Sequence, residues 1–215
     1  MKISVTSCPL CLAQKIEKYS EDKIRSYHLC SFCQLVFVAR EDLISFDQEK
    51  ERYEAHENNP DDEGYSKYLQ KIVIEIKPQL PETGKGLDFG CGKTTILADH
   101  LKNLNYEMDS YDAYFLKDES IWDKQYDFII LSEVIEHLRM PRQEMRQLMR
   151  VLKPQGKLFI KTKYMPSSKA EFDQWFYKRD STHVQFFSPE SMGYLQNFLG
   201  LSSVKNIGTD LYCID

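Results

Sequence analysis

One stretch near the middle of the chain combines an acidic residue, two glycines and the start of a helical pattern. An apolar run ends in Asp88, and Gly90 and Gly92 follow it directly before an amphipathic pattern over 96–104. This order predicts a strand, a tight turn and a helix whose first N–H groups point at a ligand. Asp112 stands 22 residues after Gly90, where an acidic residue can hold ribose hydroxyls. A Gly-x-Gly pair alone also occurs in ordinary strand-to-helix turns, but together with both acidic residues it favours nucleoside binding.

Four of the six cysteines form two Cys-x-x-Cys pairs separated by 18 residues. The four predicted metal ligands are Cys8, Cys11, Cys30 and Cys33. This spacing is typical of a structural zinc site, in which two tight turns supply four thiolates to a tetrahedral ion. Because all four positions are cysteine, no coordination position stays open for catalysis. A segment this short cannot build a core, so the ion would supply most of its folding energy.

The remaining candidates for sulfur or imidazole chemistry near the cysteine pairs are weaker. His28 would be redundant as a fifth ligand. Cys91 and Cys213 stand alone in the sequence and are predicted to be small core residues. Apolar residues around the second pair indicate ribbon strands. Such a ribbon is predicted to cap the rest of the molecule, although a free ribbon could also bind RNA or protein.

Length, composition and charge bound the class of protein. The 215 residues allow one ordinary core and a small appendage, and the 42% hydrophobic content suits a globular enzyme. No run is long enough for a membrane span and no signal pattern opens the chain, so a cytoplasmic location without membrane partners is expected. The net charge of −5 argues against a large nucleic-acid footprint.

The glycine-rich stretch resembles the nucleoside-binding loop of class I S-adenosylmethionine-dependent methyltransferases. Thr94 departs from that resemblance, because the family usually has a third glycine there. The resemblance implies a Rossmann-like, doubly wound, mostly parallel α/β sheet and S-adenosylmethionine as cofactor. The cofactor-binding residues that it implies are Asp88, Gly90, Cys91, Gly92, Asp112, Ser132 and Glu133.

The second half of the chain extends the resemblance. The continuous apolar run 126–132 predicts a strand buried on both faces, and the Glu-x-x-Glu-His over 133–137 resembles the same segment of ubiquinone-biosynthesis-type methyltransferases. A helix over 142–152, a turn at 153–156 and a strand over 157–162 match the family's fifth unit. A short antiparallel pair, around 204–206 and 211–214, is expected to close the sheet.

The third-strand region departs from the family. Only 14 residues separate Asp112 from Asp127, too few for the usual helix, strand and helix, so this strand is expected to be very short or missing. The acidic residue that contacts the adenine amine in relatives then has no clear counterpart. Asp118 and Glu119 are the available guesses.

Candidate acceptor residues gather in two segments. The loop 172–184 resembles a subset of bacterial methyltransferases with Trp-x-Tyr followed by Asp-x-Thr-His, and a packed aromatic plug is the alternative. His183 and His137 are the candidate general bases, since histidine accepts a proton near neutral pH; a loop-fixing role for His137 is equally open. The candidate substrate-binding residues are Tyr53, His56, Trp175 and Tyr177. A solvated helix face is the alternative for the first two.

The sequence thus predicts a zinc-ribbon-like module over 1–40, a helical linker or lid over 41–81 and a methyltransferase domain over 82–215. The cysteine pairs resemble a cysteine-rich N-terminal module of some related enzymes, which include sugar methyltransferases and a ribosomal-RNA methyltransferase. The predicted function is methyl transfer from S-adenosylmethionine to a small-molecule acceptor. An RNA or protein acceptor recruited by the ribbon is second, and an inactive zinc- or nucleoside-binding protein is a third alternative.

Overall fold

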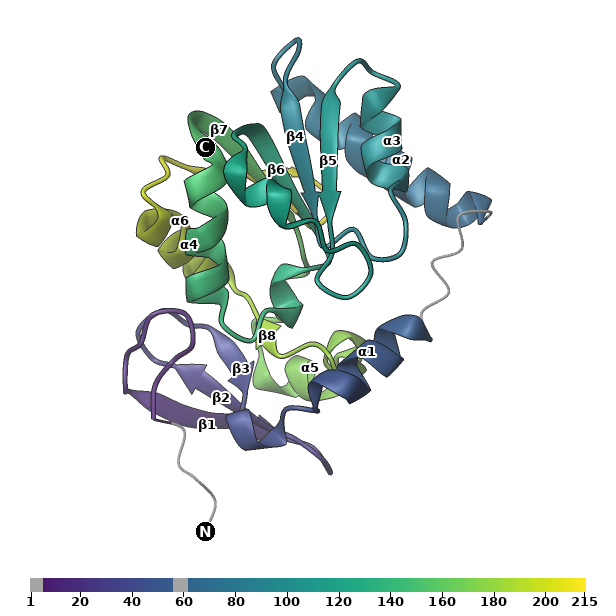
Figure 1. Cartoon of the computed structure of the whole chain (residues 1–215). Coiled ribbons are helices and arrows are strands. Elements are labelled where there is room, and N and C mark those ends of the chain that lie inside the picture. Colours follow the sequence, from purple (N-terminus) through teal and green to yellow (C-terminus); the bar gives the residue numbers. More distant parts are fainter. Residues whose placement is uncertain (1–5, 56–61) are drawn as a thin grey trace.

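The computed structural model describes residues 6–55 and 62–215. Its main sheet has six strands in the order β5-β4-β6-β7-β10-β9 (Figure 1). The strands are β4 (Lys85–Phe89), β5 (Glu107–Tyr111), β6 (Tyr126–Ser132), β7 (Leu152–Lys161), β9 (Val204–Gly208) and β10 (Leu211–Ile214). The first four are parallel, and β10 runs antiparallel to both β7 and β9. The predicted doubly wound sheet with its antiparallel closing pair is confirmed.

Side-chain alternation along β6 explains why helices cover both faces of this sheet. Phe128 and Ile130 pack with α2 and α3, whereas Ile129 and Leu131 pack with α4 and α6. Successive residues of a strand point to opposite faces, so an unbroken apolar run needs cover on both. The covering helices are α2 (Glu63–Ile76), α3 (Ile96–Lys102), α4 (Pro141–Val151) and α6 (Pro189–Leu199).

The strands that follow β4 in the sequence are added to both of its sides. The first, β5, pairs with one edge of β4, and the next, β6, pairs with the other edge, so the strand order reverses beside β4. In open α/β sheets the ligand binds at the carboxyl ends of the strands beside such a reversal. Between β5 and β6, the described chain holds one isolated bridge, Asp112 to Leu116, and the 3-10 helix η3 (Glu119–Asp123). The predicted loss of the third strand is therefore confirmed.

The turn predicted at 153–156 lies inside β7. Tyr126 pairs with Leu152, and Phe128 pairs with Lys157, so the residues between them form a bulge. A strand was predicted over 157–162, and β7 contains this range as far as Lys161.

A second, four-stranded sheet carries the cysteine pairs. Its antiparallel order is β1 (Ile16–Glu21), β2 (Ser26–Cys30), β3 (Val36–Val38) and β8 (Gln185–Phe186). The last strand comes from the C-terminal half, so the ribbon is completed by a segment far away in the sequence (Figure 1). This pairing supports the cap interpretation of the ribbon, while the predicted boundary at residue 40 stays a prediction.

Three short helical elements belong to neither sheet and to none of the helices that cover the main sheet. They are α1 (Phe46–Glu54), α5 (Lys169–Gln174) and the 3-10 helix η5 (Phe176–Arg179). Two further 3-10 helices, η1 (Arg40–Asp42) and η2 (Lys77–Gln79), flank α1 and α2, and a third, η4 (Ile135–His137), follows β6. The predicted loop at 172–184 is thus partly helical. Within 6–55 and 62–215, no helix is both long and apolar enough to cross a lipid bilayer.

Candidate active site

The glycine loop follows β4 and is shaped by two left-handed residues. Gly90 has φ +81° and Gly92 has φ +67°, values that side chains other than glycine adopt only with strain. A Cβ at Gly90 would lie 2.5 Å from Cγ2 of Val134. The backbone N–H groups of Gly90 and Cys91 both donate to the carbonyl of Tyr111, at 2.7 and 3.1 Å, which ties the loop to the end of β5.

Asp112 joins this loop to the next one. Its Oδ2 accepts from the Gly92 N–H at 3.0 Å, and its Oδ1 accepts from the N–H groups of Tyr114 at 2.8 Å and Phe115 at 3.1 Å. The carboxylate therefore stands at the carboxyl end of β5, beside the glycines. This is the place where the sequence predicted a ribose-binding acid.

Asp88 lies beneath the loop. It is buried, and burial, followed by the charges of Asp112 and Asp99, raises the pKa of Asp88 to about 7. Thr94 is also buried, and its Oγ1 has no hydrogen-bond partner among the described residues.

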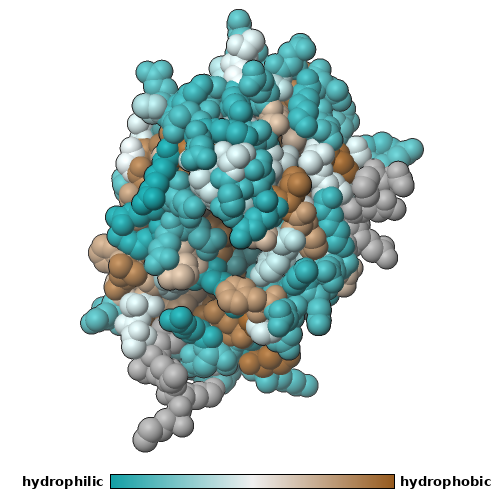
Figure 2. All heavy atoms as spheres, in the orientation of Figure 1, coloured by the Kyte–Doolittle hydropathy of each residue, from teal (hydrophilic) through white to brown (hydrophobic). Residues whose placement is uncertain are grey.

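A cavity of about 710 Å³ opens beside the glycine loop. Six of the seven predicted cofactor residues line it: Gly90, Cys91, Gly92, Asp112, Ser132 and Glu133. Asp88 does not. Figure 2 shows hydrophobic side chains gathered around a hollow on this face of the molecule. Much of the wall is formed by aromatic residues that were not among the predicted site residues: Phe46, Tyr65, Tyr68, Phe89, Tyr111, Tyr114 and Phe115.

Helices from the predicted lid segment form one wall of this cavity. Arg139 holds α1 in place, since its Nη2 donates to Glu49 Oε2 at 2.5 Å and to the carbonyl of Ile44 at 2.8 Å. Tyr53 of α1 lines the cavity, with its ring 5.5 Å from that of His137. His56 lies outside the described residues.

The end of β6 brings Glu133 into the cavity with an unusual backbone. Its φ of +55° is left-handed, a conformation that costs free energy in a non-glycine residue and often occurs at functional sites. Its Oε1 accepts from the Tyr68 hydroxyl at 3.4 Å, and its Oε2 accepts from the Tyr177 hydroxyl at 2.9 Å.

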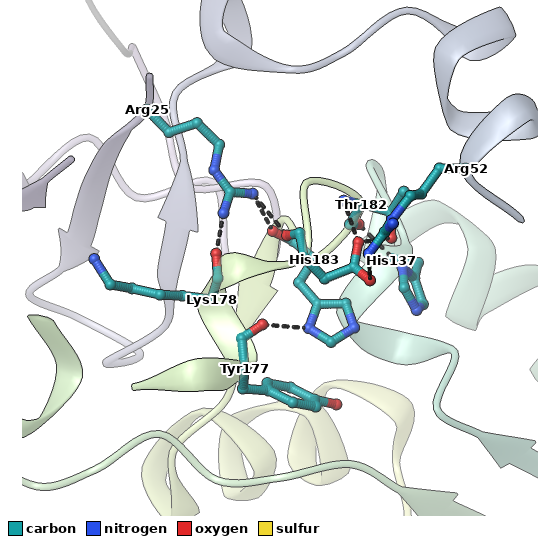
Figure 3. Close-up of polar contacts among 8 residues, drawn as sticks. Arg25, Arg52, His137, Tyr177, Lys178, Thr182 and His183 are labelled. Atoms are coloured by element: carbon teal, nitrogen blue, oxygen red, sulfur yellow. Dashed lines mark hydrogen bonds and ion pairs between the residues drawn. The ribbon is translucent and has the colours of Figure 1, made fainter. Parts of the chain in front are cut away.

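The two candidate histidines lie next to each other (Figure 3), and both line this cavity. The ring centroids of His137 and His183 are 4.7 Å apart. Nδ1 of His183 donates to the carbonyl of Tyr177 at 2.7 Å, and Nδ1 of His137 donates to the carbonyl of Thr182 at 3.0 Å. In a neutral ring Nε2 then carries the lone pair. Burial lowers the pKa of His183, which favours this neutral form.

A fully buried carboxylate, Glu136, lies next to this pair. The Tyr177 hydroxyl contacts Glu136 Oε1, while Glu136 Oε2 has no partner among the described residues. Burial and the nearby charge of Glu133 raise the pKa of Glu136 well above its usual value. Burial and both carboxylates raise the pKa of Tyr177 as well, so its hydroxyl stays protonated.

The loop that carries His183 is held from the ribbon. Arg25, on the turn between β1 and β2, donates from Nη1 to the carbonyls of Asp180 at 2.9 Å and His183 at 3.1 Å, and from Nη2 to that of Lys178 (Figure 3). Although burial opposes it, hydrogen bonds from Thr182 lower the pKa of Asp180 to about 2.

A second cavity, of about 620 Å³, shares Tyr68, Glu133 and His183 with the first. Five cationic side chains line it: Arg52, Lys71, Lys161, Lys163 and Arg179. Four carboxylates line it as well, and three of them form ion pairs with these cations: Asp180 with Arg52, Glu75 with Lys71 and Asp210 with Lys163. Tyr177 also lines it. Trp175 lines neither cavity; its ring packs 4.9 Å from that of Tyr177 and 6.0 Å from that of Phe186.

The four cysteines of the ribbon converge on one point. Their Sγ atoms all lie within 4.8 Å of one another, with Cys8 to Cys33 at 3.6 Å and Cys11 to Cys30 at 3.4 Å. A disulfide bond is far shorter, about 2.05 Å, whereas sulfurs bound about 2.3 Å from one tetrahedral zinc ion lie about 3.8 Å apart. The donor set therefore fits a structural zinc ion.

The chain matches a family described as a methyltransferase domain, over residues 62–205, which is more than half of its length. The chain belongs to the methyltransferase domain family. No curated protein matches it. The methyltransferase class that the glycine loop predicted is thereby confirmed, while the ubiquinone-type subclass stays a prediction.

Solved methyltransferases share the fold. An S-adenosylmethionine-dependent methyltransferase from Archaeoglobus fulgidus is 18% identical, with 75% of this chain and 76% of that chain covered and a TM-score of 0.51. A methyltransferase of calicheamicin biosynthesis, bound to S-adenosylhomocysteine, is 13% identical, with 69% and 54% covered and a TM-score of 0.48. Coclaurine N-methyltransferase is 20% identical, with 72% and 53% covered and a TM-score of 0.42. The chain spans about half the length of the last two proteins.

The adenine-contact guesses find no support in this methyltransferase domain. Asp118 caps η3 by accepting from the Ser120 N–H at 2.9 Å, and Glu119 accepts from Nε1 of Trp122 at 3.0 Å. Neither residue lines either cavity. Both side chains are committed to the short segment that replaces the third strand.

Proposed function

We propose that this methyltransferase domain transfers a methyl group from S-adenosylmethionine to a small acceptor that carries an anionic group. The observation that carries the proposal is that one cavity is lined both by the glycine loop with Asp112 and by the pair His137 and His183. A donor held by the first set would present its methyl group toward the second.

The cofactor end is assigned to the residues predicted from the sequence. The backbone of Gly90, Cys91 and Gly92 approaches the ligand closely, and Asp112 receives the ribose hydroxyls. Ser132 and Glu133 line the cavity at the end of β6, where donor and acceptor would meet. Asp88 supports the loop from below, as a buried residue.

The reaction needs alignment, exclusion of water and loss of a proton from the acceptor. The acceptor oxygen or nitrogen attacks the methyl carbon while the carbon–sulfur bond breaks and its electron pair stays on sulfur. His183 and His137 are proposed to activate the acceptor, because the ring nitrogens opposite their bonded Nδ1 atoms carry lone pairs. Tyr53 and Tyr177 would shape the acceptor's surroundings.

The second cavity supports an anionic acceptor. Lys161 is only 6% exposed, and its Nζ donates to the carbonyl of Thr209 at 2.7 Å. No carboxylate lies within ion-pair distance of Lys161 in the described part of the chain. A buried ammonium without a counter-ion is costly, so an anionic ligand group would be stabilised there.

The ribbon is proposed to hold one zinc ion with a structural role. Four buried or partly buried thiol groups at tetrahedral spacing support it. A hydrogen bond from Cys33 lowers the pKa of Cys8 to about 6, whereas burial raises the pKa of Cys11 to about 12.

Calorimetric titration with S-adenosylmethionine and S-adenosylhomocysteine tests the cofactor site. We expect the wild type to bind both, and Asp112→Ala to bind them at least tenfold more weakly, which corresponds to about 1.4 kcal/mol. Asp99→Ala is the matched control, because Asp99 lies on α3 and lines neither cavity. Absence of binding to the wild type would refute the proposed function.

A further inference from the structure

The cysteine ribbon exposes an aromatic ring where it meets α4 and α6 (Figure 1). Phe32, which lies between the two cysteines of the second pair, is 69% exposed, and its ring centroid is 5.8 Å from that of Tyr194 on α6. The half-buried ring of Tyr194 lies parallel to that of Phe198, one helical turn further along, at 6.4 Å. None of these three residues lines either cavity, so the rings form a separate surface.

Three arginines extend this surface along α4. Arg142, Arg146 and Arg150 recur at every fourth residue, so they follow one side of the helix about 6 Å apart along its axis. The guanidinium carbon of Arg142 is 4.0 Å from the centroid of the Phe198 ring, and that of Arg146 is 4.9 Å from it. Such cation–π contacts hold the two planar groups against the ring. We call Phe32, Tyr194, Phe198 and the three arginines the ribbon–helix surface.

Arg142 fixes the ribbon part of this surface to the helix part. Its Nη1 donates to the carbonyl of Leu10, in the first cysteine turn, at 3.1 Å, and to the Tyr194 hydroxyl at 3.5 Å. The ring of Phe32 and the arginines of α4 therefore keep a fixed spacing, although they come from opposite halves of the chain. The ribbon–helix surface is thus a property of the docked ribbon and not of the ribbon alone.

The arginines of this surface have no acidic partner within the described residues 6–55 and 62–215. No carboxylate of these ranges lies within ion-pair distance of any of the three. Glu144, between the first two on α4, lines the first cavity. Two exposed carboxylates adjoin the rings: Glu17 accepts from the Ser31 hydroxyl at 2.8 Å, and Glu190 lies one turn before Tyr194 on α6. Arginines without a counter-ion attract an anionic partner.

We propose that the ribbon–helix surface binds single-stranded RNA. Proteins that bind single strands combine aromatic rings, on which unpaired bases stack, with cationic groups that contact the phosphates. Phe32 offers an open ring face, and the arginines of α4 form a row of cations beside it. RNA presents unpaired bases in its loops and ends, whereas a duplex keeps its bases stacked on one another.

The charge of the chain agrees with a small RNA footprint. Three arginines would contact about three phosphates, and the net charge of −5 opposes a longer contact. An acidic protein segment would also be attracted by the arginines, but the flat, open ring of Phe32 favours a stacked base. RNA binding here is independent of methyl transfer, because the surface lies outside both cavities.

Fluorescence anisotropy of a labelled oligouridylate of about twelve nucleotides, titrated with the zinc-loaded full chain at several salt concentrations, tests the surface. We expect the logarithm of the binding constant to fall with the logarithm of the salt concentration at a slope of about −2, which is about −0.7 for each arginine–phosphate contact. Arg146→Gln should reduce the slope to about −1.4. Phe32→Ala should instead weaken binding about tenfold at every salt concentration, because a stacked base is lost while the ionic contacts remain.

Lys102→Gln and Ile74→Ala are the matched controls. Both residues are exposed and lie on α3 and α2, which cover the opposite face of the main sheet from α4 and α6. Both variants should bind oligouridylate as the wild type does. Retained zinc and a single unfolding transition show that a variant is folded.

Three results would overturn the RNA proposal. They are no binding of oligouridylate by the wild type at low salt, equal affinity for an RNA duplex of the same length, and unchanged affinity and slope in both surface variants. Tighter binding of a polyglutamate peptide than of oligouridylate would overturn it as well and would assign the surface to an acidic protein partner. Titration with S-adenosylhomocysteine reports on the first cavity alone, so the proposed methyl transfer stands or falls separately.

Discussion

At the scale of single residues, Asp88 couples the glycine loop to pH. Burial raises its pKa to about 7 in the folded chain, from an ordinary value of 3.8. The folded state therefore holds a proton that the unfolded state has lost between these two values. Since stability falls with rising pH wherever the folded state binds more protons, Asp88 destabilises the cofactor-free protein increasingly from about pH 4 to pH 7.

Asp88→Asn should remove this pH dependence. We expect the variant and the wild type to have similar free energies of unfolding near pH 4, and the variant to be more stable at pH 8 by a few kcal/mol, at about 1.4 kcal/mol per pKa unit. Urea denaturation without ligand, at both pH values, measures the difference.

Asp109→Asn is the control for this prediction. Burial acts to raise the pKa of Asp109, but hydrogen bonds from Tyr126, Lys124 and Lys85 lower it below its usual value. The stabilisation from a lowered pKa is present above the ordinary value of 3.8 and is lost only as pH falls below it, so this variant should be less stable than the wild type at pH 8 and, by a similar amount, near pH 4. The same sign in both variants would contradict the argument.

At the scale of elements, the turn between β1 and β2 supports the loop that carries His183. Arg25 is 6% exposed and donates to three carbonyls of that loop. Removal of one partner leaves buried carbonyls unsatisfied, at about 1–3 kcal/mol for each. The ribbon thus positions the loop of His183, a residue proposed for the acceptor site, even though the ribbon itself lines neither cavity.

Arg25→Ala should loosen the loop without changing the cofactor end. Hydrogen exchange of amides 178–184 should become at least tenfold faster, while that of amides 86–92 and the affinity for S-adenosylhomocysteine stay unchanged. Lys23→Ala, an exposed change on the same turn, is the matched control. Equal protection of the loop in Arg25→Ala and the wild type would show that Arg25 does not hold it.

Also at the element scale, aromatic rings close the edge where the third strand is missing. The rings of Phe89 and Tyr111 stack at 5.2 Å, and that of Trp122, from η3, lies 6.1 and 5.8 Å from them. Aromatic pairs at these distances add to the free energy gained by burial. A single turn of 3-10 helix with one large side chain thereby covers the end of the sheet.

At the scale of the whole molecule, the cysteine cluster and the methyltransferase sheet share one core. Cys8 and Cys33 belong to the same buried hydrophobic cluster as Leu131 of β6 and Met145 of α4. In addition, β8 belongs to the ribbon sheet although its residues lie in the C-terminal half. The ribbon and the domain are therefore expected to unfold together.

Removal of the proposed zinc ion by a chelator should lower the melting temperature of the whole protein in a single transition. A loss of several kcal/mol corresponds to roughly 10 °C for a chain of this size. Differential scanning calorimetry measures it, and a separate low-temperature transition would mean that the ribbon unfolds alone. Metal analysis is the companion measurement: Cys33→Ser should lose zinc, whereas Cys91→Ser, outside the cluster, should retain it.

The sequence by itself predicted the main elements of the sheet and the residues proposed for the cofactor end of the site. The positions of β4, α3 and β6 follow from apolar periodicity, and Asp112 follows from its distance to Gly90. These features depend on interactions within about one β-α-β unit, where spacing fixes geometry. The two cysteine pairs could be recognised as metal ligands for the same reason, because each turn supplies its two thiols from within four residues.

Only the tertiary structure decided what meets at the acceptor end. The contacts of Arg25 with the loop before β8, of Tyr177 with Glu133 and Glu136, and of β3 with β8 join segments that lie more than 40 residues apart. It also placed Trp175 in an aromatic cluster rather than in a cavity. Such pairings depend on how two sheets pack, which no local pattern of residue types encodes, and so the sequence could name candidates there but not their partners.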